Sequence, residues 1–266
     1  MITSYGNQSV KEVMQLNQKA KVRNSKGLFV VEGAKMFVEA PEDRIERVYI
    51  AERAEKELRG VYEDKLGRLS IEIVSDDVFD KMSDTKTPQG ILCLVRQFHY
   101  GLEDLLAGGN NKKHMLFILL EDLQDPGNLG TIFRTGEGAG VDGVIMSRRT
   151  VDIYNPKTIR STMGSVYRVP FLYADDLRET IRTLQTNDIA VYAAHLEGTK
   201  CYDEYDYRRG TAFLVGNEGN GLRKETAGCA DEYLRIPMEG SVESLNAAVA
   251  SSILLYEAYR QRRNML

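Results

Sequence analysis

Short apolar runs alternate with amphipathic stretches along the whole chain. In the first hundred residues, β-branched and aliphatic side chains gather in runs that predict strands, with helical stretches between them. These runs cover residues 28–33, 47–52, 71–76 and 90–95. This half of the chain therefore predicts a small α/β domain.

A second alternation begins after residue 114. We expect strands at 115–121, 142–146, 189–195, 212–216 and 232–237, and helices near 128–139, 156–162, 175–185 and 244–262. Strands that alternate with helices predict a mostly parallel sheet with helices on both faces. The stretch 98–113 combines glycines, asparagines and charges, as linkers do. The expected organisation is an N-terminal domain over 1–97, a linker over 98–113 and a C-terminal domain over 114–266.

Composition narrows the class of protein. The chain has 266 residues, 42 % of them hydrophobic, which suffices for two domains with apolar cores. It has no run of about 18 apolar residues and no apolar signal-peptide core, so we expect a cytoplasmic protein without a membrane partner. Its three cysteines lie far apart, and its cysteines and histidines show no metal-ligand spacing. We therefore expect that the protein has no disulfide framework and no metal site. The cysteines and histidines are Cys93, Cys201, Cys229, His99, His114 and His195.

Charge is segregated along the chain although the net charge is only −4. Residues 1–35 carry six lysines and arginines against two glutamates, and residues 147–170 carry five against one aspartate. This pattern suits a polyanionic partner on one face of the molecule. Two ordinary solvated basic stretches account for it equally well.

Three polar, glycine-rich turns each follow a predicted buried strand in the C-terminal half. They lie within 119–140, 215–222 and 236–262. Each has an ordinary explanation as a tight turn or a helix cap, with Ser241 or Ser244 as a suitable N-cap. Ligands of parallel sheets bind beyond the carboxyl ends of the strands, so the coincidence of three such turns predicts a binding site. Neither a P-loop nor a dinucleotide-binding fingerprint is present in the sequence.

Three motifs in these turns resemble those of the SpoU (TrmH-like) RNA ribose methyltransferases of the SPOUT superfamily. They are N-x-G-x-x-x-R from Asn128 to Arg134, G-x-E-G from Gly216 to Gly219, and IPM followed by GS-x-x-SLN-x-x-VA from Ile236 to Ala250. The motifs occur in the order of the family and near its spacing, over about 119–262. Residues 21–40 are similar to the L30e-like RNA-binding domain that precedes the catalytic domain in many members.

The resemblance implies a fold, a cofactor and an assembly. The fold is an α/β SPOUT domain with a parallel sheet and a deep trefoil knot, preceded by a smaller α/β L30e-like domain. The implied cofactor is S-adenosylmethionine, held largely by backbone groups, and the implied assembly is a homodimer with active sites near the subunit interface. Glycines at 216 and 219 are expected to let the main chain close on the cofactor. The position match gives as cofactor contacts Leu214, Gly216, Gly219, Ile236, Met238 and Leu245.

The implied reaction is methyl transfer to the 2′-hydroxyl of a ribose in RNA. Its expected catalytic residues, by the position match, are Asn128, Arg134, Glu218, Ser244 and Asn246. The family arginine is often assigned as the base, but guanidinium groups stay protonated in proteins. We therefore expect Arg134 to act as a cation that orients the target and stabilises the developing alkoxide. Asn128 is expected to position Arg134 or a partner-subunit group, and Glu218 to hold Arg134 or Asn246, or only to anchor its loop.

RNA is the expected partner, with 23S ribosomal RNA as the expected substrate. Phosphate contacts are expected from basic residues of both segments, which would make affinity depend on salt. These residues are Lys19, Lys21, Arg23, Lys26, Arg148, Arg149 and Arg160. Tyr154 and Tyr167 either stack on unpaired bases or, as is commoner, pack half-buried in the protein.

Several alternatives remain open from the sequence. A transfer RNA is the other candidate substrate, and a related SPOUT enzyme that methylates a base nitrogen is the nearest alternative chemistry. A catalytically silent RNA-binding protein of ribosome assembly would keep the same motifs. A nucleotide-binding oxidoreductase lacks its fingerprint here. The sequence does not decide between a housekeeping role and antibiotic resistance.

Overall fold

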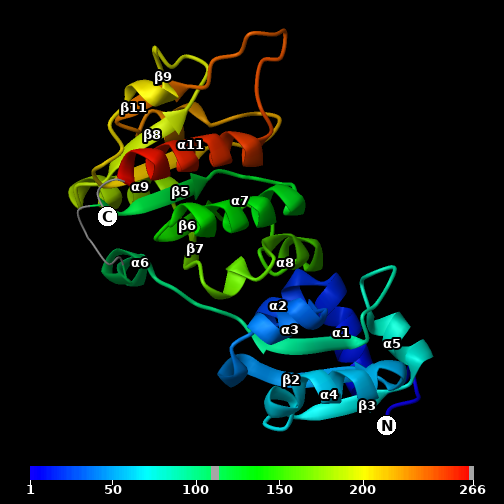
Figure 1. Ribbon diagram of the computed structural model, residues 1–266. Helices are drawn as coiled ribbons and strands as arrows, with labels where there is room; N and C mark the ends of the chain where they lie inside the picture. Colours follow the sequence, from blue (N-terminus) through cyan, green and yellow to red (C-terminus); the bar gives the residue numbers. More distant parts are fainter. Residues whose placement is uncertain (109–113, 264–266) are drawn as a thin grey trace. The chain divides into compact units, whose positions relative to one another are not determined.

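The computed structural model describes residues 1–108 and 114–263, and the chain divides into two compact units (Figure 1). Unit 1 comprises Met1–Phe98 with Asp152–Tyr167, and unit 2 comprises His99–Val151 with Arg168–Leu266. Both units combine helices with a sheet, which confirms the expected α/β class.

Unit 1 contains a four-stranded sheet in the order β1-β4-β2-β3. Strand β4 is antiparallel to both β1 and β2, and β2 is parallel to β3. The strands are β1 Leu28–Glu32, β2 Ile45–Ala51, β3 Ile71–Val74 and β4 Ile91–Arg96. The helices of its N-terminal part are α1 Gln8–Gln18, α2 Ala20–Lys26, α3 Ala34–Glu39, α4 Glu55–Leu66 and α5 Asp76–Met82. Apolar side chains of α1 and α5 pack with Tyr49, Leu92 and Leu94 of the sheet to form its core.

The segment 152–167, which the sequence placed in the C-terminal domain, folds as part of unit 1. It carries helix α8, Pro156–Thr162, and connects two strands of the sheet of unit 2. The aromatic ring of Tyr154 lies 4.6 Å from that of Phe29, and its hydroxyl bonds to the backbone of Phe98. The hydroxyl of Tyr167 donates to the carbonyl of Met36 at 3.1 Å. Both tyrosines are at most 8 % exposed, so they pack in the protein instead of offering a face to bases.

Unit 2 contains a seven-stranded sheet among its described residues, in the order β7-β6-β5-β10-β8-β11-β9. Every pairing in it is parallel, which confirms the expected sheet type. Its central strands are buried along their whole length, as in sheets covered on both faces. The strands are β5 Leu116–Leu120, β6 Gly143–Ser147, β7 Phe171–Ala174, β8 Ala190–Ala194, β9 Lys200–Cys201, β10 Thr211–Val215 and β11 Glu232–Arg235.

Short elements of unit 2 escaped the sequence analysis. Strand β9 is two residues long, too short to show a periodic pattern, and the four-residue strand β7 was not singled out either. Part of the expected linker 98–113 is helix α6, and its residues 109–113 lie outside the described residues. The helices of unit 2 are α6 Leu102–Gly108, α7 Pro126–Ala139, α9 Leu177–Thr186, α10 Lys224–Ala227 and α11 Ala247–Arg262. Helices α7 and α11 lie side by side (Figure 1).

The two longest helices of unit 2 begin at side-chain caps close to the expected site. The carboxylate of Asp125 accepts from the N–H of Asn128 at 2.8 Å, and Pro126 occupies the first turn of α7. Helix α11 is capped by Asn246, which accepts from the N–H groups of Ala248 and Val249. The helix therefore starts three residues later than expected, and neither Ser241 nor Ser244 is its cap.

Candidate functional site

The three polar turns meet at one edge of the sheet of unit 2. They follow β5, β10 and β11, and all three strands are parallel within one sheet. Strands β5 and β10 are direct neighbours, and β8 separates β10 from β11. Their carboxyl ends consequently point the same way, as expected for a ligand site in such a sheet.

Glu218 ties the turn after β10 to the turn after β5. One carboxylate oxygen accepts from the N–H of Asp125 and from Nδ2 of Asn128, both at 3.0 Å. The other oxygen accepts from the N–H of Gln124 at 3.1 Å. Burial alone would raise the pKa of the Glu218 carboxyl, but these hydrogen bonds to the ionised form outweigh it and hold the pKa below its usual value.

Asn246 extends this network to the turn before α11. Its Nδ2 donates to Oδ1 of Asn128 at 2.9 Å, while its Oδ1 caps the helix. A chain of hydrogen bonds thus runs from Glu218 through Asn128 to Asn246. It joins the three turns, and it places together three of the five expected catalytic residues.

Gly216 is needed for the shape of its own loop. An added Cβ would lie 2.5 Å from the carbonyl oxygen of Gly221 and from the amide nitrogen of Leu222. The loop is closed there by backbone hydrogen bonds between Asn217 and Gly221 in both directions, at 3.0 and 2.9 Å. Gly221 has a φ of 64°, in the left-handed region that favours glycine. The close approach at Gly216 is therefore between two parts of the chain, a reason different from the expected contact with the cofactor.

Gly219 shows no such crowding, because an added Cβ would meet only Oδ1 of Asn217 at 3.6 Å. That Oδ1 accepts from the N–H groups of Gly219 and Asn220, and Nδ2 of Asn217 donates to the carbonyl of Asp122. Asn217 thus organises the loop, a role that the sequence analysis did not assign. The Asn-Glu-Gly-Asn run within a glycine turn is the signal for it, because asparagine side chains commonly bond to the backbone two residues on.

A pocket of about 360 Å³, which we call the loop pocket, opens beside the turns after β10 and β11. Five of the six expected cofactor contacts line it, and the sixth, Leu214, is fully buried in β10. The five are Gly216, Gly219, Ile236, Met238 and Leu245. Glu218 and Ser244 line it as well. Apolar side chains facing a loop of backbone polar groups fit an adenosine-like ligand, so the residues present suit S-adenosylmethionine.

Arg134 and Ser244 differ from the other expected catalytic residues. Both are exposed, and neither side chain has a hydrogen-bond or ion-pair partner within 1–108 and 114–263. Arg134 stands on α7, six residues and nearly two helical turns beyond Asn128. These two side chains keep their polar atoms available, whereas Asn128, Glu218 and Asn246 are engaged with one another and with the backbone.

The expected RNA-binding residues of unit 1 fall into two groups. Lys19, Lys21 and Lys26 are exposed, and Lys26 pairs with Glu12 at 2.5 Å. Arg23 is instead 3 % exposed. Its guanidinium bonds to Asp152 at 2.6 Å and to the carbonyl of Leu16 at 2.6 Å. This placement corrects the expectation of a phosphate contact and gives Arg23 a structural role in unit 1.

The expected basic residues of the second segment are at least partly accessible. The side chains of Arg148 and Arg149 are 65 % and 68 % exposed and pair with Asp175 and Asp122. Arg160, in unit 1, pairs with Asp84 at 2.7 Å. In residues 1–108 and 114–263, no group of three or more His, Cys, Asp or Glu side chains is placed to hold a metal ion. None of the described helices is long and apolar enough to cross a membrane.

Comparisons with known proteins agree with this geometry. Residues 115–256 match the sequence model of the SpoU rRNA Methylase family, and residues 7–93 match the MRM3-like substrate binding domain. The chain is 32 % identical to the 23S rRNA (guanosine(2553)-2′-O)-methyltransferase RlmP of Bacillus subtilis, over 96 % of this chain and 97 % of that protein.

Two solved structures extend the likeness to the fold. One is an AdoMet-bound rRNA methyltransferase from Sinorhizobium meliloti, with 32 % identity and a TM-score of 0.85 over 100 % of this chain and 98 % of that one. The other is the SpoU methyltransferase AviRb from Streptomyces viridochromogenes in complex with AdoMet, with 25 % identity and a TM-score of 0.86 over 97 % and 98 % of the two chains. The chain therefore belongs to the SpoU rRNA methylase family of S-adenosylmethionine-dependent methyltransferases.

Proposed function

We propose that this enzyme methylates the 2′-hydroxyl of a ribose in RNA and that its substrate is 23S ribosomal RNA. The observation that carries the proposal is the loop pocket, where five expected cofactor contacts border the hydrogen-bond chain of Glu218, Asn128 and Asn246. The relative from Bacillus subtilis, which matches along nearly the whole chain, is named for 2′-O-methylation of a guanosine in 23S rRNA. The chain matches a substrate binding domain in its N-terminal part and an rRNA methylase family in its C-terminal part, which supports the same substrate class.

The side chains divide the work between positioning and chemistry. S-adenosylmethionine, when bound in the loop pocket, supplies an electrophilic methyl group. Asn128, Glu218 and Asn246 are positioning residues, because their hydrogen bonds hold three turns together and leave few polar atoms for substrate. They fix the start of α7 and of α11, and thereby the walls of the pocket.

Arg134 and Ser244 are the groups with open polar atoms. A guanidinium stays protonated in proteins, so Arg134 stabilises the negative charge that develops on the ribose oxygen as it attacks. The hydroxyl of Ser244, in the wall of the loop pocket, orients the ribose by a hydrogen bond. The proton of the 2′-hydroxyl leaves to solvent or to a neighbouring phosphate oxygen during or after attack.

A second copy of the chain covers part of the face formed by α7 and α11. Three large apolar side chains of α11 are 40 to 49 % exposed there, namely Val249, Tyr256 and Tyr259. The two tyrosine rings contact each other edge to face at 5.8 Å. On α7, Gly138 leaves room for one of these tyrosines, because a Cβ there would lie only 3.1 Å from the hydroxyl of Tyr256. Clustered exposed apolar residues of this kind mark an interface, and a monomeric mass for wild type in sedimentation would contradict the dimer.

The substrate is tested by methyl transfer from labelled S-adenosylmethionine to unmodified 23S ribosomal RNA and, in a separate reaction, to transfer RNA. We expect label in 23S ribosomal RNA at a kcat/KM at least about tenfold higher than in transfer RNA, a difference of 1.4 kcal/mol in transition-state binding. Preferential labelling of transfer RNA would contradict the substrate. Cofactor binding without transfer to either RNA would favour a silent RNA-binding protein instead.

A further inference from the structure

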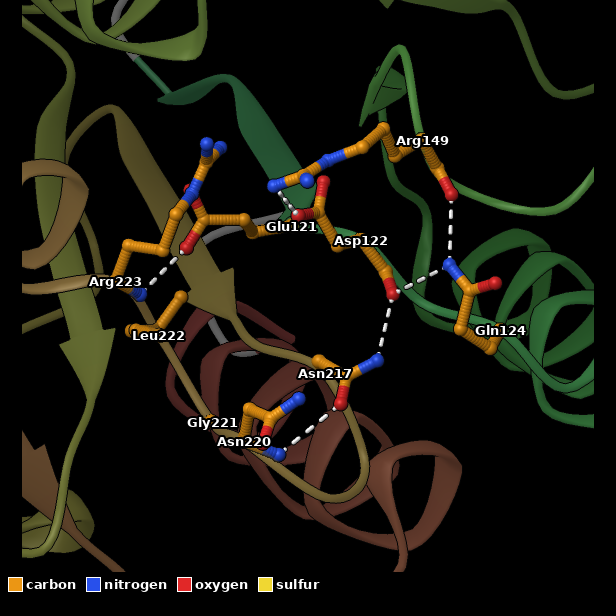
Figure 2. Close-up of a pocket in the computed structure, with 9 residues that line it drawn as sticks. All are labelled: Glu121, Asp122, Gln124, Arg149, Asn217, Asn220, Gly221, Leu222 and Arg223. Carbon is orange, nitrogen blue, oxygen red and sulfur yellow. Dashed lines mark hydrogen bonds and ion pairs between the residues drawn. The ribbon is translucent and has the colours of Figure 1, made fainter.

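A second pocket, of about 370 Å³, lies against the turn after β10, which also lines the loop pocket. Binding of the cofactor in the loop pocket does not explain this second pocket. We call it the β5–β10 pocket, because most of its lining residues belong to the turns that follow these two strands, with Arg149 added from the turn after β6 (Figure 2). Asn217, Asn220 and Leu222 line both pockets. The loop is therefore a shared wall, with the loop pocket on one side and the β5–β10 pocket on the other.

The floor of the β5–β10 pocket is a braced turn at Asp122. Asp122 has a φ of 54°, a left-handed conformation that costs free energy in residues other than glycine. Its carbonyl accepts from Nε2 of Gln124 at 2.9 Å and from Nδ2 of Asn217 at 2.8 Å, as Figure 2 shows. Its carboxylate accepts from the hydroxyl of Ser147 at 2.6 Å and pairs with Arg149 at 2.7 Å. Backbone strain held in place by this many bonds is typical of a binding site.

The charges that line the β5–β10 pocket cancel in pairs. The carboxylate of Glu121 is 1 % exposed and binds Arg223 through both oxygens. Asp122 pairs with Arg149. Two carboxylates facing two guanidinium groups leave no net charge for a free phosphate or a metal ion. A neutral ligand with hydrogen-bonding edges suits the pocket better.

Three of the side chains that line this pocket have polar groups left open. Among the described residues, the side-chain amide of Asn220 and Oε1 of Gln124 have no hydrogen-bond partner. Within the same residues, Arg149 forms an ion pair with Asp122 alone, and its side chain is 68 % exposed. Side-chain amides read the edges of nucleobases, and the plane of a guanidinium stacks on them. Leu222 adds an apolar surface for the ring.

We propose that the β5–β10 pocket binds one unpaired base of the RNA substrate, next to the ribose that is methylated. Asn220 hydrogen-bonds the edge of the base, Arg149 covers its face, and Leu222 lies beneath it. The inference rests on the proposed function, since it names what the same enzyme recognises in its substrate. The shared loop lets base binding on one side align the ribose with the cofactor on the other.

The test compares steady-state methylation of a ribosomal RNA fragment by the wild type, Asn220→Ala and Arg149→Ala. Arg208→Ala is the matched control, because this arginine of unit 2 is 59 % exposed, pairs with one aspartate and lies outside both pockets. We expect the KM for RNA to rise about tenfold in each pocket variant, the loss of one or two hydrogen bonds to a base. The control should stay within about twofold of the wild type.

A second readout separates base binding from damage to the shared loop. The Kd for S-adenosylmethionine, measured by titration without RNA, should stay within about twofold of wild type in Arg149→Ala, because this residue lines the β5–β10 pocket and not the loop pocket. RNA fragments that each lack one base are compared as substrates of the wild type. The KM should rise when the missing base is one unpaired base near the target ribose. Removal of the same base should raise the KM of Asn220→Ala little further, because this variant already lacks the contact with that base.

Two results would overturn the inference. One is an RNA KM of Asn220→Ala and Arg149→Ala equal to that of Arg208→Ala. The other is a rise in KM that is fully explained by a weaker Kd for S-adenosylmethionine. Either result leaves the proposed function intact as long as the wild type methylates the RNA. Failure of the wild type to methylate any RNA would instead refute the proposed function itself.

Discussion

Gly216→Ala is the most informative single change in the loop pocket. The added Cβ would lie 2.5 Å from the carbonyl oxygen of Gly221 and the amide nitrogen of Leu222, where 3.4 to 4 Å is ordinary contact. Both are backbone atoms, so no side chain can rotate away to make room. The φ of Gly216 lies outside the left-handed region, so the backbone itself admits alanine and the effect is purely steric.

The magnitude follows from what must move. Relieving the clash opens the turn that the two hydrogen bonds between Asn217 and Gly221 close. Overpacking of a tight site costs about 1–3 kcal/mol, and a lost hydrogen bond about 1 kcal/mol. We expect the cofactor-free protein to lose about 2 kcal/mol of unfolding free energy. The Kd for S-adenosylmethionine should rise at least about tenfold, because the loop forms a wall of its pocket.

Urea denaturation and calorimetric titration with S-adenosylmethionine measure the two effects separately. Gly219→Ala is the control, since its Cβ meets only Oδ1 of Asn217 at 3.6 Å, and both quantities should stay near wild type. A Gly216→Ala protein with wild-type stability but weak cofactor binding would show that the glycine faces the cofactor, as the sequence suggested. Wild-type values for both would refute the steric reasoning altogether.

Three further predictions concern the same network and the correction in unit 1. Asn246→Ala removes the cap of α11 and the hydrogen bond to Asn128, so thermal denaturation should show a loss of about 1–2 kcal/mol of unfolding free energy. Asn246→Asp keeps the cap and should lose less. Because the pKa of Glu218 is held below its usual 4.5, its carboxylate stabilises the fold above that pH and the stabilisation is lost as the pH falls through the lowered pKa. The difference in unfolding free energy between wild type and Glu218→Gln should accordingly shrink as the pH falls below 4.5, and a constant difference would contradict the assigned hydrogen bonds. Arg23→Met should destabilise the protein by about 2 kcal/mol, since it strands the carboxylate of Asp152, whereas Lys21→Met should leave stability unchanged and weaken RNA binding in a filter assay. The reverse pattern would restore Arg23 as a phosphate contact.

Much of the fold was readable from the sequence because its central strands are apolar runs bounded by glycine and polar turns. Strands β5, β6 and β10 are buried along their full length, so their pattern is unambiguous. Strand β9 was missed because its two residues carry no period. The trefoil knot expected from the resemblance stays a prediction.

The sequence named residues that the structure brings to one pocket, but it did not name the hydrogen-bond partners that hold them. The motif match placed Gly216, Ile236 and Leu245 at one pocket, as the structure has them. Two of the three partners of Glu218 are backbone N–H groups at residues 124 and 125, far away along the chain, and backbone groups leave no mark in a sequence motif. The burial of Arg23 has the same origin, since its partner Asp152 lies in a segment that only the fold brings back to unit 1.

The central claim is that this chain transfers a methyl group to a ribose, with Arg134 as a cation and not as the base. It is tested most directly by nucleoside mass spectrometry of 23S ribosomal RNA after single-turnover reaction with wild type, Arg134→Lys and Arg134→Ala. The account predicts one 2′-O-methylated nucleoside, a rate at least about 100-fold lower for Arg134→Ala, and partial recovery with Arg134→Lys. A methyl group on a nucleobase instead of the ribose, or an Arg134→Ala enzyme as fast as wild type, would contradict it.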